Sequence, residues 1–276
     1  MDTEPHAAGP DIGRMALSVV IPAYDEALRI GPTLVRINGY LKGRGAPFEI
    51  IVVDDGSRDN TKEVVANAMR TMPSIRLVEN GINRGKGYSL RNGFLNSRGG
   101  LVLFCDADLS TPIEEVEPFI AEVGRGMDIV IGSRALSGSH IVKRQPLYRM
   151  LMGKTFNKFV RLFLIDGIAD TQCGFKLLRR DTCGMIVSRL TVERFAYDVE
   201  LLFLARKYGL RVAELPVMWM NSPDSKVHAV RDSANMFLDL MRVAWDNISG
   251  KYIVPQPIPI IEEEAQWTSG RVKKAA

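Results

Sequence analysis

Short apolar runs alternate with segments of helical periodicity through the first half of the chain. The periodic segments predict helices over residues 32–41, 61–69, 88–95 and 112–123. The runs between them predict five strands: LSVVIPA, FEIIVVDD, IRLVEN, LVLFCDAD and DIVIGSR. Because stretches such as IIVV are apolar without alternation, we expect helices on both faces of the sheet. The pattern predicts an α/β fold with a mostly parallel central sheet flanked by helices.

The order of elements changes after Arg134. A long basic segment comes first, and GFKLLRR then predicts a further strand. Two helices are predicted over residues 181–189 and 198–208, followed by an extended stretch, RVAELPVMWM. An amphipathic helix over residues 230–245 is the last predicted element. The first half therefore has the pattern of a nucleotide-binding sheet, and the second half has that of an elaboration on the acceptor side.

Length and composition fit one domain with two tails. The chain has 276 residues, of which 46% are hydrophobic and 25% are charged, so collagen-like, disordered and disulfide-scaffold classes are excluded. We expect one domain over residues 15–250, between a disordered tail at 1–14 and a Pro-rich, charged tail at 251–276. The three cysteines have no CxxC spacing, so neither a disulfide framework nor a thiolate zinc site is expected.

The positive charge is concentrated in one segment. Residues 134–165 contain seven Lys and Arg residues and no acid, so this window carries a charge of +7. The net charge of the whole chain is +4, so the rest of the chain carries −3. Phe156, Phe159 and Phe163 interleave with these bases, which is typical of a helix lying on an anionic membrane surface. The alternative is a core-packed helix with a solvated basic face. Because the basicity belongs to this one amphipathic segment, nucleic-acid binding is not expected.

The chain is predicted to be cytoplasmic and peripherally associated with the membrane. Its longest apolar runs are far below the roughly 18 residues that a membrane-spanning helix requires. Its first residues, MDTEPHAAGPDIGR, have acids where a signal peptide has bases, and they lack an apolar core.

Polar residues follow each of the five predicted strands. In open parallel sheets, ligands bind outside the carboxyl ends of the strands, so these residues are expected to converge on one crevice. They are Tyr24, Asp25 and Glu26; Asp54, Asp55 and Ser57; Asn80, Asn83, Gly85 and Lys86; Asp106 and Asp108; and Ser133 and Arg134.

The two aspartates of CDAD are candidate metal ligands. The strand LVLFC delivers Asp106 and Asp108 to the edge of a buried sheet, although a DxD pair is also compatible with a solvated turn. Carboxylates combined with diphosphate and water oxygens are the usual ligands of Mg²⁺. The three histidines show no metal-ligand spacing. We therefore expect Mg²⁺ or Mn²⁺ on Asp108, assisted by Asp106.

Two further turns are candidate nucleotide contacts. Asp54 and Asp55 either cap the helix that follows or, in the case of Asp55, accept a hydrogen bond from a nucleobase N–H. Residues 83–87 form a Gly-rich turn before a helix, where backbone amides and Lys86 can approach phosphate or ribose. The turn lacks GxxxxGK[ST] and GxGxxG, so it supports neither a P-loop nor dinucleotide binding.

Taken together, these motifs resemble the family 2 glycosyltransferases of GT-A fold. The matching pieces are SVVIPAYDE, EIIVVDDGSRDNT, NRGKGYSLRNG, FCDADLSTP and DIVIGSR. DTQCGFKLLRRD and ERFAYDVELLFLARKYG resemble the polyprenyl-phosphate branch, which includes dolichyl-phosphate glucosyltransferases. The resemblance covers about residues 16–245 and implies transfer of a sugar, with inversion, from a nucleotide diphosphate sugar to a lipid phosphate. UDP-glucose is favoured over GDP-mannose as the donor.

The resemblance also implies roles for particular residues. Nucleotide-sugar contacts are implied for Pro22, Tyr24, Glu26, Asp55, Lys86 and Asp106, with the metal at Asp106 and Asp108. We expect Arg134, Lys143 and Arg144 to hold the acceptor phosphate.

The need for a catalytic base depends on the acceptor. A phosphate monoester is mostly dianionic at pH 7 and needs no strong base, whereas a hydroxyl acceptor requires a carboxylate to take its proton. Asp198 is the first candidate for that base and Asp170 the second, although each could instead orient a cation or cap a helix.

The same motifs are compatible with other functions. A soluble or glycolipid hydroxyl acceptor is the main alternative. CDADLS also matches the DxDx[ST] motif of haloacid-dehalogenase-type phosphatases, in which Asp106 would be the nucleophile. A non-enzymatic nucleotide-sugar-binding protein is a further alternative. The oligomeric state cannot be predicted.

Overall fold

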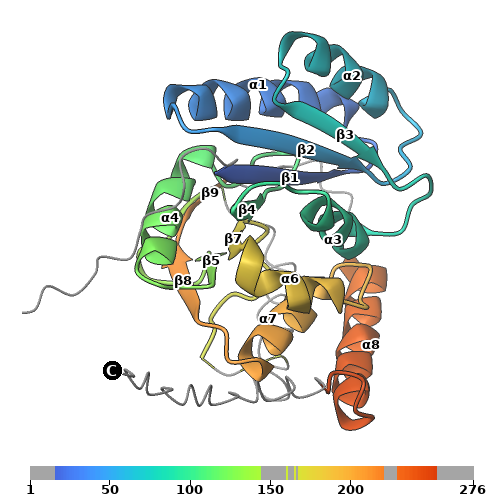
Figure 1. Cartoon of the computed structure of the whole chain (residues 1–276). Coiled ribbons are helices and arrows are strands. Elements are labelled where there is room, and N and C mark those ends of the chain that lie inside the picture. Colours follow the sequence, from blue (N-terminus) through green and yellow to red (C-terminus); the bar gives the residue numbers. More distant parts are fainter. Residues whose placement is uncertain (1–15, 144–159, 161–164, 166, 221–228, 254–276) are drawn as a thin grey trace, which may run out of the picture.

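The computed structural model describes residues 16–143, 160, 165, 167–220 and 229–253, with only the backbone described at Lys143 and at residues 229–234. A seven-stranded sheet with the order β3-β2-β1-β4-β7-β5-β8 lies at its centre (Figure 1). Its strands are β1 Leu17–Ala23, β2 Phe48–Asp54, β3 Ile75–Glu79, β4 Leu101–Phe104, β5 Ile129–Ser133, β7 Lys176–Arg179 and β8 Val212–Pro216. β7 runs antiparallel to both of its neighbours, and the other pairings in this sheet are parallel. The predicted α/β class with a mostly parallel sheet is confirmed.

Helices cover both faces of the sheet. One face carries α1 Ala27–Gly43, α2 Thr61–Thr71, the short 3-10 helix η1 Ile113–Glu115 and α4 Val116–Gly124. The other face carries α3 Lys86–Leu95, α6 Arg180–Ser188, α7 Tyr197–Lys207 and α8 Ala229–Ile248. Alternate residues of β1 explain the division: Val19 and Ile21 pack in the first core, while Val20 packs in the second. This burial of both faces is the reason that the strands are apolar throughout.

Two helices differ most from their predicted form. α1 starts at Ala27, before the expected start at Pro32, because the Arg29 and Ile30 amides already donate to the Glu26 carbonyl. Pro32 therefore lies inside the helix. The helix expected over residues 112–123 is divided, with η1 preceding α4.

A small second sheet was not predicted. β6 His140–Lys143 pairs in parallel with β9 Met218–Met220. β6 lies within the 134–165 window, so residues 140–143 of that window form a strand. Of the predicted amphipathic helix, Val160 and Ile165 are described and are buried in the core, while Phe156, Phe159 and Phe163 lie outside the described residues.

The antiparallel direction of β7 shapes the functional edge of the sheet. Lys176, the first residue of β7, pairs with Phe104 at the end of β4 and with Ile131 near the end of β5. The segment that leads into β7 thus reaches the edge where the parallel strands terminate. Within the described part of the chain, none of the helices has the length and apolar character needed to cross a bilayer.

Candidate active site

Asp106 and Asp108 lie in the loop directly after β4. The Lys86 ammonium, at the start of α3, donates to Asp106 Oδ1 at 2.6 Å. Burial alone would raise the pKa of Asp106, but the charge and hydrogen bond of Lys86 outweigh it and lower the pKa. The Ser110 amide donates to Asp108 Oδ1 at 3.0 Å, and Leu109 between them has a left-handed φ of 49°. Asp106 and Asp108 therefore lie in one loop, and Lys86 forms an ion pair with Asp106.

This pair fits a divalent cation that is completed by substrate. No hydrogen bond from a described residue reaches Oδ2 of Asp106 or of Asp108. The described residues contain no group of three or more His, Cys, Asp or Glu side chains that could hold a metal. Mg²⁺ and Mn²⁺ commonly bind through one or two carboxylates plus phosphate and water oxygens. The two free oxygens suit that mode, whereas an all-protein metal cage does not fit here.

Asp55 organises the Gly-rich turn that precedes α3. Its Oδ1 accepts from Asn80 Nδ2 at 2.8 Å and from the Arg84 amide at 2.9 Å, and its Oδ2 accepts from the Gly85 amide at 2.7 Å. A carboxylate offers about four lone-pair sites, so one remains for a nucleobase N–H. Asp54 accepts from the Gly56 and Ser57 amides of its own turn, and the residue before α2 is Asn60, so the prediction that Asp54 or Asp55 caps this helix is wrong.

The Gly-rich turn is pressed against residues 192–194. A Cβ at Gly85 would lie 2.5 Å from the Glu193 carbonyl oxygen, and Gly85 has a φ of 110°. A Cβ at Gly87 would lie 2.5 Å from the Val192 carbonyl oxygen. Arg84 also pairs with the Glu193 carboxylate. Only glycine permits this approach at residues 85 and 87, which fixes the position of the neighbouring Lys86.

The end of β1 adjoins Asp55. The Asp55 amide donates to the Ala23 carbonyl at 2.8 Å, which places Tyr24 beside this turn. The Glu26 carboxylate forms a two-pronged pair with Arg29 at 2.6 and 2.7 Å. Pro22 lies within β1 opposite Val53. These nucleotide contacts, implied by the resemblance, thus share one edge of the sheet, but Glu26 already has a cationic partner.

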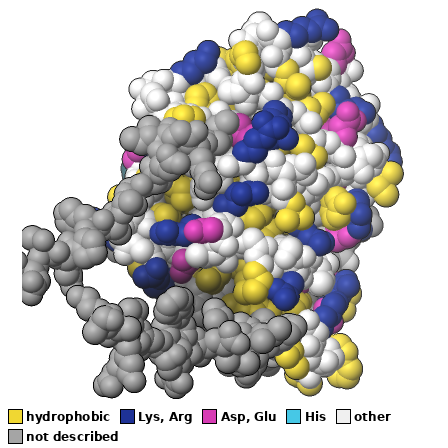
Figure 2. Space-filling view, viewed as in Figure 1, with side chains coloured by type: hydrophobic (Ala, Val, Ile, Leu, Met, Phe, Trp, Pro, Cys, Tyr) yellow, Lys and Arg dark blue, Asp and Glu magenta, His cyan; other side chains and the backbone are white. Residues whose placement is uncertain are grey.

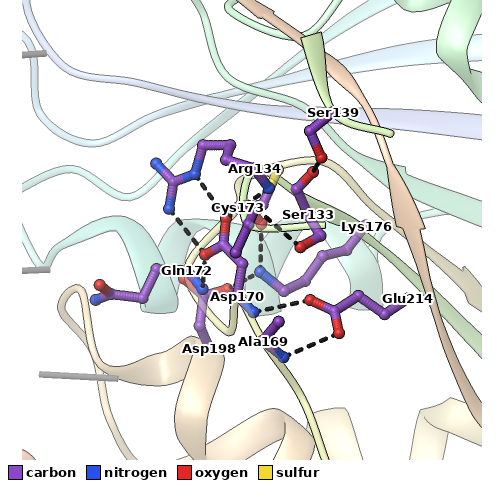
Figure 3. A network of polar contacts seen from close by, with 11 residues as sticks. Ser133, Arg134, Ser139, Ala169, Asp170, Gln172, Cys173, Lys176, Asp198 and Glu214 are labelled. Atoms are coloured by element: carbon purple, nitrogen blue, oxygen red, sulfur yellow. Dashed lines mark hydrogen bonds and ion pairs between the residues drawn. The ribbon is translucent and has the colours of Figure 1, made fainter. Parts of the chain in front are cut away.

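Arg134 and Asp170 form the second half of the site (Figure 3). Arg134 donates to Asp170 through Nε at 2.7 Å, Nη2 at 2.9 Å and its backbone amide at 3.0 Å. Burial would raise the pKa of Asp170, but the Arg134 charge and these bonds lower it to about 2. Such a weak base does not suit the role of proton acceptor, so the geometry favours the alternative in which Asp170 orients a cation. Arg144 and the side chain of Lys143 lie outside the described residues.

Lys176 is a functional candidate that the sequence analysis missed. Its side chain is fully buried, and Nζ donates to the Asp198 carboxylate and to the Cys173 carbonyl (Figure 3). Burial raises the pKa of Asp198, although the charges of Lys176 and Lys86 oppose the rise. The available signal was a lysine inside the apolar strand GFKLLRR, since a buried lysine needs an anionic partner.

The charged groups form one electrostatically connected cluster. Lys86, Lys176 and Arg134 all act on the pKa of Asp106, and Asp198 acts on that of Lys86. Four carboxylates face three cations, leaving a formal charge of −1 that suits a divalent cation. The members are Asp106, Asp108, Asp170 and Asp198 with Lys86, Lys176 and Arg134.

Gly174 supplies the space for the Asp106 carboxylate. A Cβ at Gly174 would lie 2.2 Å from Asp106 Oδ2, so Gly174→Ala must displace the carboxylate or the backbone. We expect this variant to weaken binding of UDP-glucose, the donor that the resemblance implies, by about 5- to 100-fold, because overpacking of this kind costs about 1 to 3 kcal/mol. Isothermal titration with UDP-glucose and Mn²⁺ measures the loss.

Gly184→Ala in α6 is the matched control. A Cβ at Gly184 meets nothing within 4 Å, so this variant should bind donor normally and gain about 0.5 to 1 kcal/mol in unfolding free energy. Equal donor affinity in both variants would remove Gly174 from the site.

The Arg134–Asp170 pair predicts a loss of stability in acid. The pKa of Asp170 falls from its ordinary 3.8 to about 2 in the folded protein. The pair therefore stabilises the folded state above about pH 4. This contribution disappears as the pH falls from 4 to 2. The shift corresponds to about 2 kcal/mol. Urea unfolding at pH 5 and pH 3 should show a smaller acid loss in Asp170→Asn than in wild type. The same acid loss in both proteins would contradict this assignment.

Comparisons with known proteins identify the family of the chain. The model of the family described as "Glycosyl transferase family 2" matches residues 18–184. Dolichyl-phosphate beta-glucosyltransferase ALG5A of Trichomonas vaginalis is 39% identical over 244 residues, which cover 85% of this chain and 74% of that protein. Dolichyl-phosphate beta-glucosyltransferase of Homo sapiens is 34% identical over 253 residues, which cover 87% and 78%.

A solved structure shares the fold. Glucosyl-3-phosphoglycerate synthase from Mycobacterium tuberculosis, in complex with Mn²⁺ and UDP-glucose, superimposes with a TM-score of 0.61 at 18% identity. The match covers 87% of this chain and 85% of that one. At this level of identity the likeness concerns the architecture of the sheet and its helices.

Proposed function

The chain belongs to the family 2 glycosyltransferases, and from that membership we propose that it transfers glucose from UDP-glucose to a polyprenyl phosphate of the dolichyl-phosphate type, with inversion. The observation that carries the proposal is the meeting of Asp106, Asp108 and Lys86 with the Arg134–Asp170 pair at one edge of the sheet. The relatives named above, dolichyl-phosphate beta-glucosyltransferases, support the donor sugar and the acceptor. Family membership decides against the phosphatase alternative.

The donor side would bind the nucleotide and its diphosphate. Asp55 has one acceptor site left for the base, and Lys86 stands at the diphosphate end beside Asp106. Asp108, with Asp106, would hold Mg²⁺ or Mn²⁺. When bound, the cation supplies Lewis-acid stabilisation of the charge that develops on the departing UDP. The solved neighbour that contains Mn²⁺ and UDP-glucose supports this choice of cofactor.

The acceptor side would bind the lipid phosphate. Arg134 uses Nε and Nη2 on Asp170, and a guanidinium has five N–H donors, so Nη1 remains for a phosphate oxygen. Asp170 keeps that guanidinium in a fixed orientation. A dianionic phosphate oxygen can attack the anomeric carbon from the face opposite UDP without a base, which inverts the configuration.

Asp198 supports one alternative acceptor. Its carboxylate is buried and its pKa is raised by that burial, which is a property of catalytic bases. Its Oδ1, however, accepts from Lys176. Transfer to a hydroxyl acceptor would therefore require the substrate to reach Oδ2. The lipid phosphate is favoured because it needs no such proton acceptor.

We propose that the enzyme acts at the cytoplasmic face of a membrane as a peripheral protein. A polyprenyl phosphate keeps its charged head at the bilayer surface, so the crevice must meet that surface. The basic window of residues 134–165 supports this placement through its +7 charge.

The test is transfer by the purified full chain to dolichyl phosphate in vesicles. We expect product from UDP-glucose with Mn²⁺ or Mg²⁺, little from GDP-mannose, and none in EDTA. A thermal-shift series with UDP, GDP and their sugars checks donor choice independently, since a ligand at 100 times its Kd stabilises by about 2.7 kcal/mol. Donor binding without product in single-turnover assays would favour a nucleotide-sugar-binding protein. Product with a soluble hydroxyl acceptor alone would overturn the lipid assignment.

A further inference from the structure

The outer face of α8 is apolar. Phe237, Leu238, Met241, Trp245 and Ile248 are 43 to 78% exposed. At 3.6 residues per turn these five positions fall within about 100° of the helix circumference. We call them the α8 apolar face. In Figure 2, hydrophobic side chains gather at the lower right, where Figure 1 shows α8. Exposed apolar side chains gathered on one face of a helix are a candidate interaction surface.

The opposite face of α8 holds the helix firmly in place. Leu240 and Val243 are buried in the core beneath α7. Beyond the end of α8, the Tyr252 hydroxyl donates to Glu200 of α7 at 2.5 Å. The exposed side chains therefore sit on a helix that is already packed, and their exposure is not a consequence of an undocked element.

The helix also adjoins the acceptor side of the site. Gln172 Nε2 lies 3.9 Å from Met236 Sδ of α8, and Gln172 is two residues from Asp170, the partner of Arg134. Met236 immediately precedes Phe237 in the chain, so the apolar face begins next to the segment that positions the proposed acceptor-binding arginine.

The charges around the apolar face fit a lipid surface. The acids in the described part of α8 lie away from it: Asp246 is largely buried and bound to Lys251, and Asp239 is half-buried. Arg242, more than half exposed, adjoins the face and lies 4.0 Å from Asp246 Oδ2 through its Nε. Apolar and aromatic side chains bordered by a base are typical of helices lying in a membrane interface.

We propose that the α8 apolar face docks into the surface of a lipid bilayer. The inference rests on the proposed function, because a lipid-phosphate acceptor brings a bilayer to the surface beside Gln172. Docking through α8 is distinct from attraction by the basic window: burial of apolar side chains is not screened by salt, whereas attraction between charges is. Trp245 and its neighbours would enter among the headgroups and upper acyl chains.

The experiment uses the full chain carrying Trp267→Phe, which leaves exposed Trp245 and largely buried Trp219 as the fluorophores. Vesicles of phosphatidylcholine, alone and mixed with phosphatidylserine, are added at low and high salt. We expect a blue shift of the emission, quenching by lipids brominated on the acyl chains, and binding that persists at high salt. Met241→Glu, and independently Leu238→Glu, should lower vesicle partitioning about tenfold or more. Val35→Glu, at a 62% exposed apolar position of α1, is the matched control and should bind as wild type does.

Other occupants of the face give different results. Residues 254–276 are separated from the end of α8 by five residues, and if they cover its apolar face Trp245 will resist acrylamide quenching before any vesicle is added. A second copy would instead appear as a doubled mass that Met241→Glu abolishes. Either result, or equal partitioning of Met241→Glu and Val35→Glu, overturns the proposal.

Transfer assays separate this inference from the proposed function. Met241→Glu should lose transfer to dolichyl phosphate in vesicles but keep transfer to a water-soluble short-chain polyprenyl phosphate. If Met241→Glu keeps its transfer to both acceptors and its vesicle partitioning, docking through α8 is refuted and the proposed function is not. Absence of transfer to both acceptors in the wild-type protein would refute the proposed function, whatever the vesicle binding shows.

Discussion

Asp108→Asn is expected to lower glucose transfer by about three orders of magnitude while leaving the fold intact. The substitution removes the charge that would hold the divalent cation, and Lewis-acid stabilisation of a leaving diphosphate contributes several kcal/mol to the barrier. The hydrogen bond from the Ser110 amide to Oδ1 survives, since asparagine keeps an oxygen at that position. Initial rates over a Mn²⁺ titration, together with thermal unfolding, measure both effects.

Asp181→Asn is the matched control for this prediction. Asp181 is exposed in the first turn of α6, and its Oδ1 accepts from the Thr182 amide, so the substitution changes the same charge and keeps the same kind of bond. We expect wild-type activity from it. Transfer by Asp108→Asn at the wild-type rate, or wild-type activity that persists in EDTA, would show that the cation does not act at this residue.

The half of the site around Asp106 could be predicted from the sequence, because its residues follow parallel strands. The carboxyl ends of parallel strands share an edge, so Asp55, Lys86 and Asp106 were expected together, and the structure brings them there. Their pairings were not predictable in the same way. Asp55 bonds mainly to the Gly-rich turn, because the sequence does not reveal how closely Gly85 and Gly87 let that turn approach residues 192–194.

The other half depends on contacts between distant segments. Asp170 was a candidate base, yet it is paired with Arg134, 36 residues earlier in the chain. That pairing arises because the chain returns to the sheet edge before β7, which runs antiparallel in the centre of the sheet. Strand direction and strand order are properties of the whole fold, and a local pattern such as GFKLLRR does not encode them. The lysine in GFKLLRR signals a buried ionic partner, but only the fold shows that this partner is Asp198, 22 residues later.

These long-range ion pairs link the two substrate sides. The charges of Lys86, Lys176 and Arg134 all lower the pKa of Asp106, on the proposed donor side. The charges of both lysines also act on the pKa of Asp198. A change at Arg134, the proposed acceptor contact, is therefore expected to alter the electrostatic field at Asp106, a proposed donor contact. In a crevice of low dielectric such coupling is stronger than in water, so donor and acceptor binding are expected to be interdependent.

Lys176→Met is expected to destabilise the protein by about 3 to 5 kcal/mol, the cost of leaving a buried charge without its partner. Asp198 is only 4% exposed, so water cannot replace the lost ammonium. The Cys173 carbonyl also loses a donor. Urea unfolding measures the free energy. Combining Lys176→Met with Asp198→Asn should cost at least about 2 kcal/mol less than the sum of the two single changes, because the double variant leaves no unpaired charge.

The exposed Arg36–Glu114 pair provides the control for this double-mutant cycle. Both of its side chains are 49% exposed, so Arg36→Met and Glu114→Gln should each change stability by less than about 1 kcal/mol. Additive losses in the Lys176–Asp198 cycle would contradict the buried ion pair.

The Asp198→Asn variant also tests whether Asp198 is a catalytic base. Because a dianionic phosphate needs no base, transfer to dolichyl phosphate by folded Asp198→Asn should keep the pH profile of wild type. Loss of the rise in rate with pH in that variant would instead assign Asp198 as the base and favour a hydroxyl acceptor.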